Sequence, residues 1–151
     1  MSRFLSCSLV VLAVGFASLA SSDDAKGDAE KLQGTWQASE AVANGEPIPK
    51  EQIPRIKLVF GGEKVTFHLP DGDGKPVDMS FRLDPSKKPK GVDFTVVSGA
   101  DMGNTVEGIY ELNGDMLRVC FAMGKAAKRP TEFAAPKKSG LVVLTLKRTK
   151  P

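Results

Sequence analysis

Most of this 151-residue chain consists of short runs in which apolar and polar residues alternate. In the run "PVDMSFRLD", the apolar residues Val77, Met79, Phe81 and Leu83 are separated by single polar residues. A period of two predicts a β-strand with one face toward a core and the other toward water. We expect eight such strands, at residues 34–45, 55–60, 63–69, 76–84, 91–99, 104–112, 115–122 and 140–148.

The connections between these runs predict how the sheet closes. Gly61-Gly62 and Asn113-Gly114 are tight-turn sequences that favour hairpins between consecutive strands. No long amphipathic helix is available to cover the apolar face, so the sheet must cover itself as a barrel or a sandwich. Sequential hairpins favour the barrel. The sequence therefore predicts an all-β, eight-stranded, antiparallel up-and-down barrel, with a short helical turn over residues 29–33 before the first strand.

The predicted interior is bulky. An eight-stranded barrel is just wide enough for side chains or for one small ligand. We expect a mostly filled barrel with at most a small apolar pocket, because large residues occupy the inward positions: Trp36, Ile56, Leu58, Phe60, Val65, Phe67, Phe81, Phe94, Tyr110, Leu117 and Phe121.

Residues 1–20 have the composition of a secretory signal peptide. Arg3 gives a short positive start, an apolar run follows, and Ser18-Leu19-Ala20 places small residues where a signal peptidase cleaves. A retained membrane anchor is the alternative, but the apolar run is shorter than the ~20 residues that a membrane span needs. We expect an exported protein, periplasmic or extracellular, that leaves the membrane after cleavage, with a flexible leader over 21–30 and one domain over 31–150.

Charge and cysteine content limit the function classes. Cleavage would remove Arg3 and leave 20 basic against 18 acidic residues. This near balance does not give the excess positive charge that is typical of nucleic-acid-binding proteins. Cys7 lies in the predicted signal peptide, so Cys120 would be the single cysteine of the mature chain and no intramolecular disulfide could form. We expect a monomer that is stabilised by its core.

The first predicted strand begins with Gly34-Thr35-Trp36, which resembles the Gly-x-Trp signature of lipocalins. The resemblance implies that Trp36 closes one barrel end and packs against a basic residue of the last strand. Arg148 matches that position, with Lys147 as the alternative. A guanidinium over an indole face is a favourable cation–π contact.

A second resemblance covers nearly the whole domain, from about Lys31 to Arg148. The segments "KLQGTWQ", "GIYELNGDMLRVCFA", "RPTEF" and "SGLVVLTLKR" resemble a small exported domain of unassigned function that occurs in many copies in planctomycete bacteria. This resemblance implies a lipocalin-like fold and an exported location. It implies no reaction.

Cys120 is the candidate nucleophile, and His68 is the single histidine that could activate it. In the alternation both residues face away from the core, on strands that lie far apart in a meander. We therefore interpret Cys120 as a structural thiol and predict no catalytic residue. His68, Cys120 and the methionines lack the spacing of a soft-metal site, so we expect neither metal nor cofactor.

The segment "RPTEF" supplies the remaining site candidates, Arg129, Glu132 and Phe133. They are predicted to lie at a barrel mouth, either as a structural plug or as a ligand gate in which Arg129 meets an anionic group. The expected function is an exported, non-catalytic binding or interaction module, with a small apolar ligand or an envelope protein as its partner. A structural or protein-interaction domain of the cell envelope is the first alternative, and an unrecognised hydrolase that uses a glutamate or Cys120 is the second.

Overall fold

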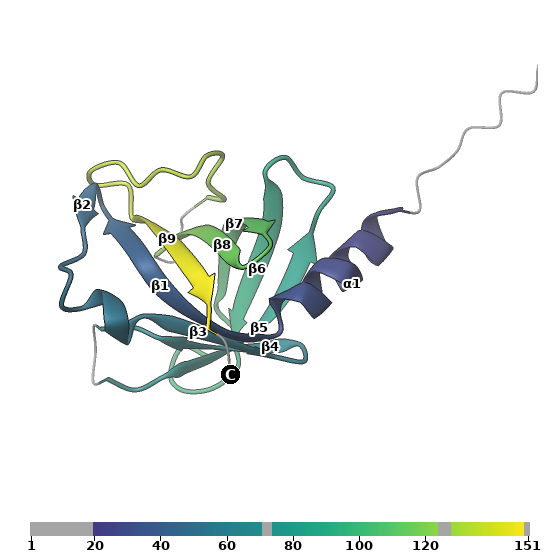
Figure 1. Cartoon of the computed structure of the whole chain (residues 1–151), viewed down its shortest axis with the longest axis horizontal. Helices are drawn as coiled ribbons and strands as arrows, with labels where there is room; N and C mark the ends of the chain where they lie inside the picture. The colour runs from purple at the N-terminus through teal and green to yellow at the C-terminus, as the bar shows by residue number, and fades with distance from the viewer. Residues whose placement is uncertain (1–19, 71–73, 124–127, 150–151) are drawn as a thin grey trace, which may run out of the picture.

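The computed structural model describes residues 20–70, 74–123 and 128–149, which form a closed antiparallel barrel (Figure 1). Each strand pairs with the next along the chain, and the last strand pairs with the first. The predicted eight-stranded barrel is confirmed. Its strands are β1 (Gly34–Ala43), β3 (Lys57–Gly61), β4 (Lys64–His68), β5 (Val77–Asp84), β6 (Lys90–Val96), β7 (Thr105–Asn113), β8 (Met116–Ala122) and β9 (Leu141–Arg148).

Two short elements fill the connection between β1 and β3. Asn44 and Gly45 have φ values of 51° and 79°, and they turn the chain from β1 into the two-residue strand β2 (Glu46–Pro47). A 3-10 turn, η1 (Ile53–Arg55), follows in the proline-rich stretch.

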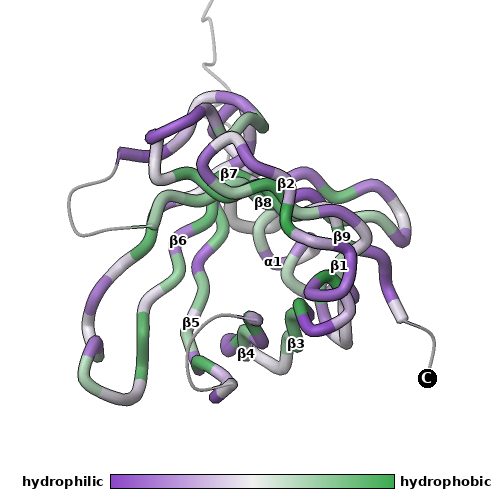
Figure 2. The backbone as a smooth tube through the Cα atoms, turned by 90° about the vertical axis from the view of Figure 1, so that its left-hand side faces the viewer, coloured by the Kyte–Doolittle hydropathy of each residue, from purple (hydrophilic) through white to green (hydrophobic). Residues whose placement is uncertain are grey.

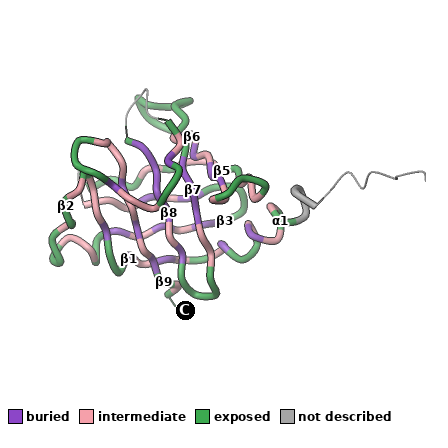
Figure 3. The backbone as a smooth tube through the Cα atoms, turned by 90° about the horizontal axis from the view of Figure 1, so that it is seen from above, coloured by how far each residue is buried: buried purple, intermediate pink, exposed green. Residues whose placement is uncertain are grey.

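Side chains occupy the interior of the barrel. Along the strands, hydrophobic residues alternate with more hydrophilic ones in Figure 2, and buried residues alternate with more exposed ones in Figure 3. Phe67 makes edge-to-face contacts with Phe94 and Phe121, at ring-centroid distances of 5.0 and 5.9 Å. Of the predicted interior residues, Phe81 is partly exposed and the others are buried. The prediction of a bulky interior therefore agrees with the observed packing.

The N-terminal segment differs from the expectation. Residues predicted as a flexible leader and a single helical turn form one helix, α1 (Ala20–Leu32), which projects from one end of the barrel (Figure 1). The helix ends where Gly34 adopts a φ of 115°, and Leu32 is buried against the barrel core. Within the described ranges, the structure contains no helix with the length and apolar character that a membrane crossing needs.

Candidate functional site

A buried carboxylate attaches α1 to the barrel. Asp28 is 8% exposed and accepts hydrogen bonds from the Tyr110 hydroxyl at 2.7 Å and the Lys90 ammonium at 2.9 Å. Burial alone would raise the pKa of Asp28, but the two hydrogen bonds and the charge of Lys90 outweigh it and lower the pKa below 3.8. Burial and the adjacent Asp28 raise the pKa of Tyr110, so the phenol stays protonated as a donor. Asp28 thus joins α1 to β6 and β7.

The last strand holds the C-terminal end of the same helix. The Arg148 guanidinium lies 4.3 Å from the Trp36 ring centroid and donates hydrogen bonds to the carbonyls of Lys31 and Gln33, the latter at 2.8 Å. The Trp36 indole N–H donates to the Leu32 carbonyl at 2.8 Å. A cation at this helix end satisfies free carbonyls and interacts favourably with the helix dipole. Arg148 therefore makes the contact expected of it, while Lys147 is exposed.

Gln33 joins the helix to the turn between β3 and β4. Its side-chain amide donates to the Gly62 carbonyl at 3.0 Å, and its side-chain oxygen accepts from the Gly62 N–H at 2.7 Å. Together with the contacts of Asp28 and Arg148, these two hydrogen bonds of Gln33 attach the helix to the barrel at three points.

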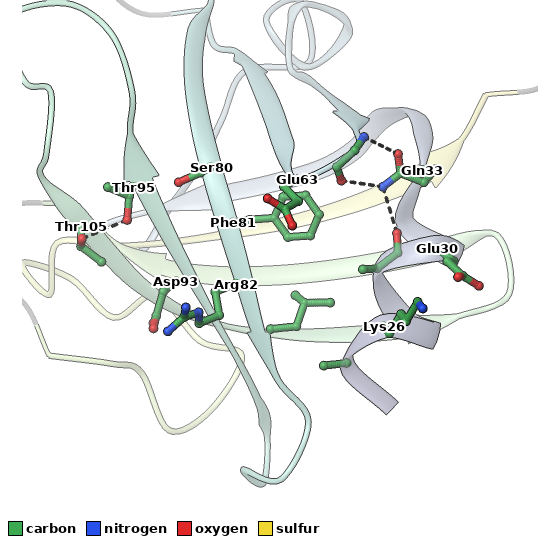
Figure 4. Close-up of a pocket in the computed structure, with 14 residues that line it drawn as sticks. Lys26, Glu30, Gln33, Glu63, Ser80, Phe81, Arg82, Asp93, Thr95 and Thr105 are labelled. Atoms are coloured by element: carbon green, nitrogen blue, oxygen red, sulfur yellow. Dashed lines mark hydrogen bonds between the residues drawn. The ribbon is translucent and has the colours of Figure 1, made fainter. Parts of the chain in front are cut away.

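These contacts leave an open groove of about 850 Å³ between α1 and β5 (Figure 4). On the helix side it is lined by Ala25, Lys26, Ala29, Glu30 and Gln33, and on the other side by the β3–β4 turn and the strands β5 to β7. β4 begins at Lys64, opposite Ser80, so residues 81–84 of β5 extend beyond the paired part of β4. Consequently the side chains of Phe81 and Leu83 are partly exposed in the groove.

Charged and hydroxyl groups surround this apolar floor. Arg82 and Asp93 lie on one side of β5, next to a hydrogen-bonded pair of hydroxyls from Thr95 and Thr105 at 3.1 Å. Glu63 lies on the other side, near the Phe81 ring (Figure 4). The lining therefore comes from both faces of β5: Phe81 and Leu83 lie on the face that packs on the core, and Arg82 and its neighbour Asp93 lie on the opposite face.

Arg129, a predicted site residue, does not line this groove but binds Asp93, which does. Its guanidinium forms an ion pair with Asp93 at 2.6 Å and donates a hydrogen bond to the Gly108 carbonyl at 2.8 Å. A Cβ atom at Gly91 would come within 3.0 Å of the guanidinium, so glycine there lets Arg129 lie against β6. Arg129 thus holds the one carboxylate that lines the groove beside Arg82.

The placement of the other two candidates corrects the expected position at a barrel mouth. Phe133 is partly buried beneath Arg118, whose guanidinium lies 4.5 Å from the ring centroid, and Arg118 points outward from β8. Glu132 is exposed. The segment that follows β8 turns back over the outer wall because it packs on outward-facing residues such as Cys120, whose thiol lies 3.7 Å from the Ala134 carbonyl.

Cys120 and His68 do not come together. Cys120 is fully buried between β8 and the overlying segment, and burial raises the pKa of its thiol. His68 ends β4, which does not pair with β8, and partial burial with nearby Lys57 lowers its pKa. Across the residues that the structure describes, no group of three or more His, Cys, Asp or Glu side chains is arranged to hold a metal ion.

Comparisons with known proteins give no relative. No family model matches the chain, and the searches of curated proteins and of solved structures found no match. The resemblance to the planctomycete domain therefore stays a prediction, and the site must be interpreted from its geometry.

The groove was not predicted from the sequence, although one signal pointed to it. Ala25, Asp28, Ala29 and Leu32 recur at helical spacing, which is the pattern of a helix with one packed face. This pattern by itself predicts a helix that packs against the barrel. It would not have identified Phe81 or Arg82 as groove residues, because their strand pattern matches that of the other strands.

Proposed function

We propose that this protein is an exported, non-catalytic binding module whose ligand lies in the groove between α1 and β5. The observation that carries the proposal is the contrast between a barrel interior occupied by side chains and a groove that leaves Phe81 and Leu83 partly exposed. Its volume of about 850 Å³ falls in the range of small-molecule sites. A ligand on the outside of the barrel replaces the expected ligand in its interior.

The rest of the proposal has separate support. A non-catalytic role is favoured because Cys120 is enclosed and because it lies on a strand that does not pair with the strand of His68. A nucleophile without an adjacent base is a poor catalyst. Export is inferred from the composition of residues 1–20, which lead into α1.

A groove-filling substitution tests the location of the site. Ala25 lines the groove, whereas Lys31 is an exposed residue of the same helix that does not line it. Ala25→Trp should therefore weaken binding of the amphipathic dye 1-anilinonaphthalene-8-sulfonate by at least about tenfold in a fluorescence titration, because the indole takes up ligand space. Lys31→Trp should leave the titration unchanged.

Thermal unfolding of both variants checks that the helix remains docked. Equal dye binding by the two folded variants would place the site elsewhere and would refute the proposed function. Native mass spectrometry of the purified protein then identifies any molecule that Ala25→Trp alone releases.

A further inference from the structure

We propose that this groove binds an extended peptide as an added antiparallel strand on the free edge of β5, with an acidic side chain opposite Arg82. This inference rests on the proposed function, because it names the ligand class of the same groove. It is carried by the backbone edge at Leu83, where β5 continues beyond its pairing with β4 and both faces of β5 line the groove (Figure 4).

The hydrogen bonds of β5 show which of its residues point toward the groove. Backbone groups of successive residues in a strand point to opposite edges. The Asp78 carbonyl accepts a hydrogen bond from Val97 N–H at 3.1 Å, on the side of β6. Phe81 N–H donates to the Glu63 carbonyl at 3.1 Å, on the side of β4. Even-numbered residues of β5 therefore point toward β6, and odd-numbered residues point toward β4.

Leu83 consequently has a free N–H and a free carbonyl at the groove. Its backbone points to the side of β4, but the register of β4 with β5 ends at Lys64 opposite Ser80. No other backbone group in the described part of the chain supplies a partner. Across the groove, α1 presents the methyl groups of Ala25 and Ala29, which offer no competing hydrogen bond. An unpaired edge of this kind is a template for a further strand.

The two faces of β5 determine which side chains the added strand would carry. In an antiparallel strand, the residue paired with Leu83 has its side chain on the core face, and the next residue lies opposite Arg82 on the outer face. The core-face position adjoins the partly exposed side chains of Phe81 and Leu83, so it favours an apolar residue. A strand at this edge contacts both faces, which accounts for a groove lining drawn from both.

Arg82 supplies the charge complementarity on the outer face. It is exposed, and its guanidinium forms no hydrogen bond or ion pair with any residue that the structure describes. Its cross-strand neighbour Asp93 is paired with Arg129 at 2.6 Å. A guanidinium binds a carboxylate through two parallel hydrogen bonds, and opposite charges on neighbouring strands stabilise the pairing. The position opposite Arg82 therefore favours glutamate or aspartate.

The turn before β4 sets the C-terminal limit of the paired peptide. A strand antiparallel to β5 on this edge continues the line of β4, so its C-terminal end approaches Gly62 and Glu63. The Glu63 carbonyl already occupies the position opposite Phe81. The ligand therefore ends or turns away directly after the residue opposite Arg82.

N-methylated peptides test the backbone pairing. Isothermal titration of the purified protein would use the capped peptide acetyl-Thr-Thr-Val-Glu-amide, whose valine pairs with Leu83. Methylation of the valine nitrogen should weaken binding at least about tenfold, because this N–H donates to the Leu83 carbonyl. The glutamate nitrogen points away from β5, so its methylation is the matched control and should change the affinity by less than about twofold.

Amide hydrogen exchange measured by NMR gives a second readout of the same contact. The Leu83 N–H is unpaired in the free protein, and saturating peptide should slow its exchange at least about tenfold. The Arg82 N–H points toward β6 and should be protected with or without peptide. An unchanged exchange rate at Leu83 in the saturated protein overturns the strand pairing.

A double-substitution cycle tests the contact with Arg82. Replacing the glutamate of the peptide by glutamine should weaken binding about threefold to fivefold. Arg82→Gln should remove this difference, whereas Arg55→Gln, which changes an exposed charge outside the groove, should preserve it. A difference that persists in Arg82→Gln overturns the acidic position.

The outcomes separate this inference from the proposed function. Equal loss of affinity for the two methylated peptides, or no peptide binding at millimolar concentration, overturns the added strand while dye exclusion by Ala25→Trp still supports the groove. Peptide binding that is unaffected by Ala25→Trp would contradict the groove itself.

Discussion

Removing the carboxylate of Asp28 should loosen α1 and destabilise the whole barrel. In Asp28→Ala the Tyr110 hydroxyl, which belongs to a residue only 2% exposed, loses its acceptor. An unsatisfied buried donor costs about 1–3 kcal/mol. Lys90 is 44% exposed at its side chain, so water can replace its ion pair and it adds at most about 1 kcal/mol. We expect a loss of about 1–4 kcal/mol in the free energy of unfolding.

Calorimetry and related variants measure this loss. For a domain of this size 1 kcal/mol corresponds to about 3–5 °C in Tm, so Asp28→Ala should melt about 3–20 °C lower. Asp28→Asn keeps an acceptor for Tyr110 and should lose roughly half as much. Tyr110→Phe removes the donor together with its need for a partner and should cost about 1 kcal/mol.

The same contact predicts a pH dependence. The pKa of Asp28 is lower in the folded state than its ordinary value of 3.8, so the unfolded chain takes up the proton first as the pH falls. The stabilisation by Asp28 is therefore complete above about pH 5 and is lost as the pH falls through the folded-state pKa. Denaturant titrations of wild type should show a steeper decline over this range than those of Asp28→Asn.

Glu30 provides the matched control, since it is an exposed acid on the same helix. Glu30→Ala should change Tm by no more than about 1–2 °C. If Asp28→Ala melted within that range as well, the buried contact between α1 and the barrel would contribute nothing, and our account of the helix anchor would be refuted.

Four further substitutions or reactions test other parts of the structure. Gly27→Ala should raise the free energy of unfolding by about 0.5–1 kcal/mol in chemical denaturation, because alanine favours the helix and its Cβ atom would meet nothing within 4 Å. A lower free energy of unfolding would contradict the open space beside Gly27. Arg148→Met should lower Tm by about 6–12 °C in calorimetry through loss of the helix-end hydrogen bonds and the contact with Trp36, and an unchanged Tm would show that these contacts are dispensable. Phe133→Ala should cost about 1–2 kcal/mol of unfolding free energy, since the ring is only partly buried, and a loss above about 4 kcal/mol would imply a core position. Cys120 should react slowly with iodoacetamide in the native state and rapidly in denaturant, since burial hides the thiol and raises its pKa; fast native alkylation monitored by mass spectrometry would refute this.

The barrel was predictable because its signals are local. Alternation such as Val65, Phe67 and Leu69 identifies a strand and its inward face, and a turn such as Asn113-Gly114 identifies the partner strand. The contact of Arg148 with Trp36 could also be predicted, through a resemblance that places both residues at the same barrel end. The position of the segment with Arg129 and Phe133 could not, because loop residues carry no periodic pattern that indicates the surface they cover.

By itself, then, the sequence determined the strands, their order and the residues that face the core, since these depend on neighbours within a few residues. Tertiary structure alone decided where α1 docks and which charges remain free. Asp28 and Tyr110 are 82 residues apart, and Arg129 and Asp93 are 36 apart, so nothing local indicates that either pair meets. The groove exists because β5 extends beyond the paired part of β4 and α1 docks beside it. The free charge of Arg82 likewise follows from the pairing of Asp93 with Arg129, which only the folded barrel brings together.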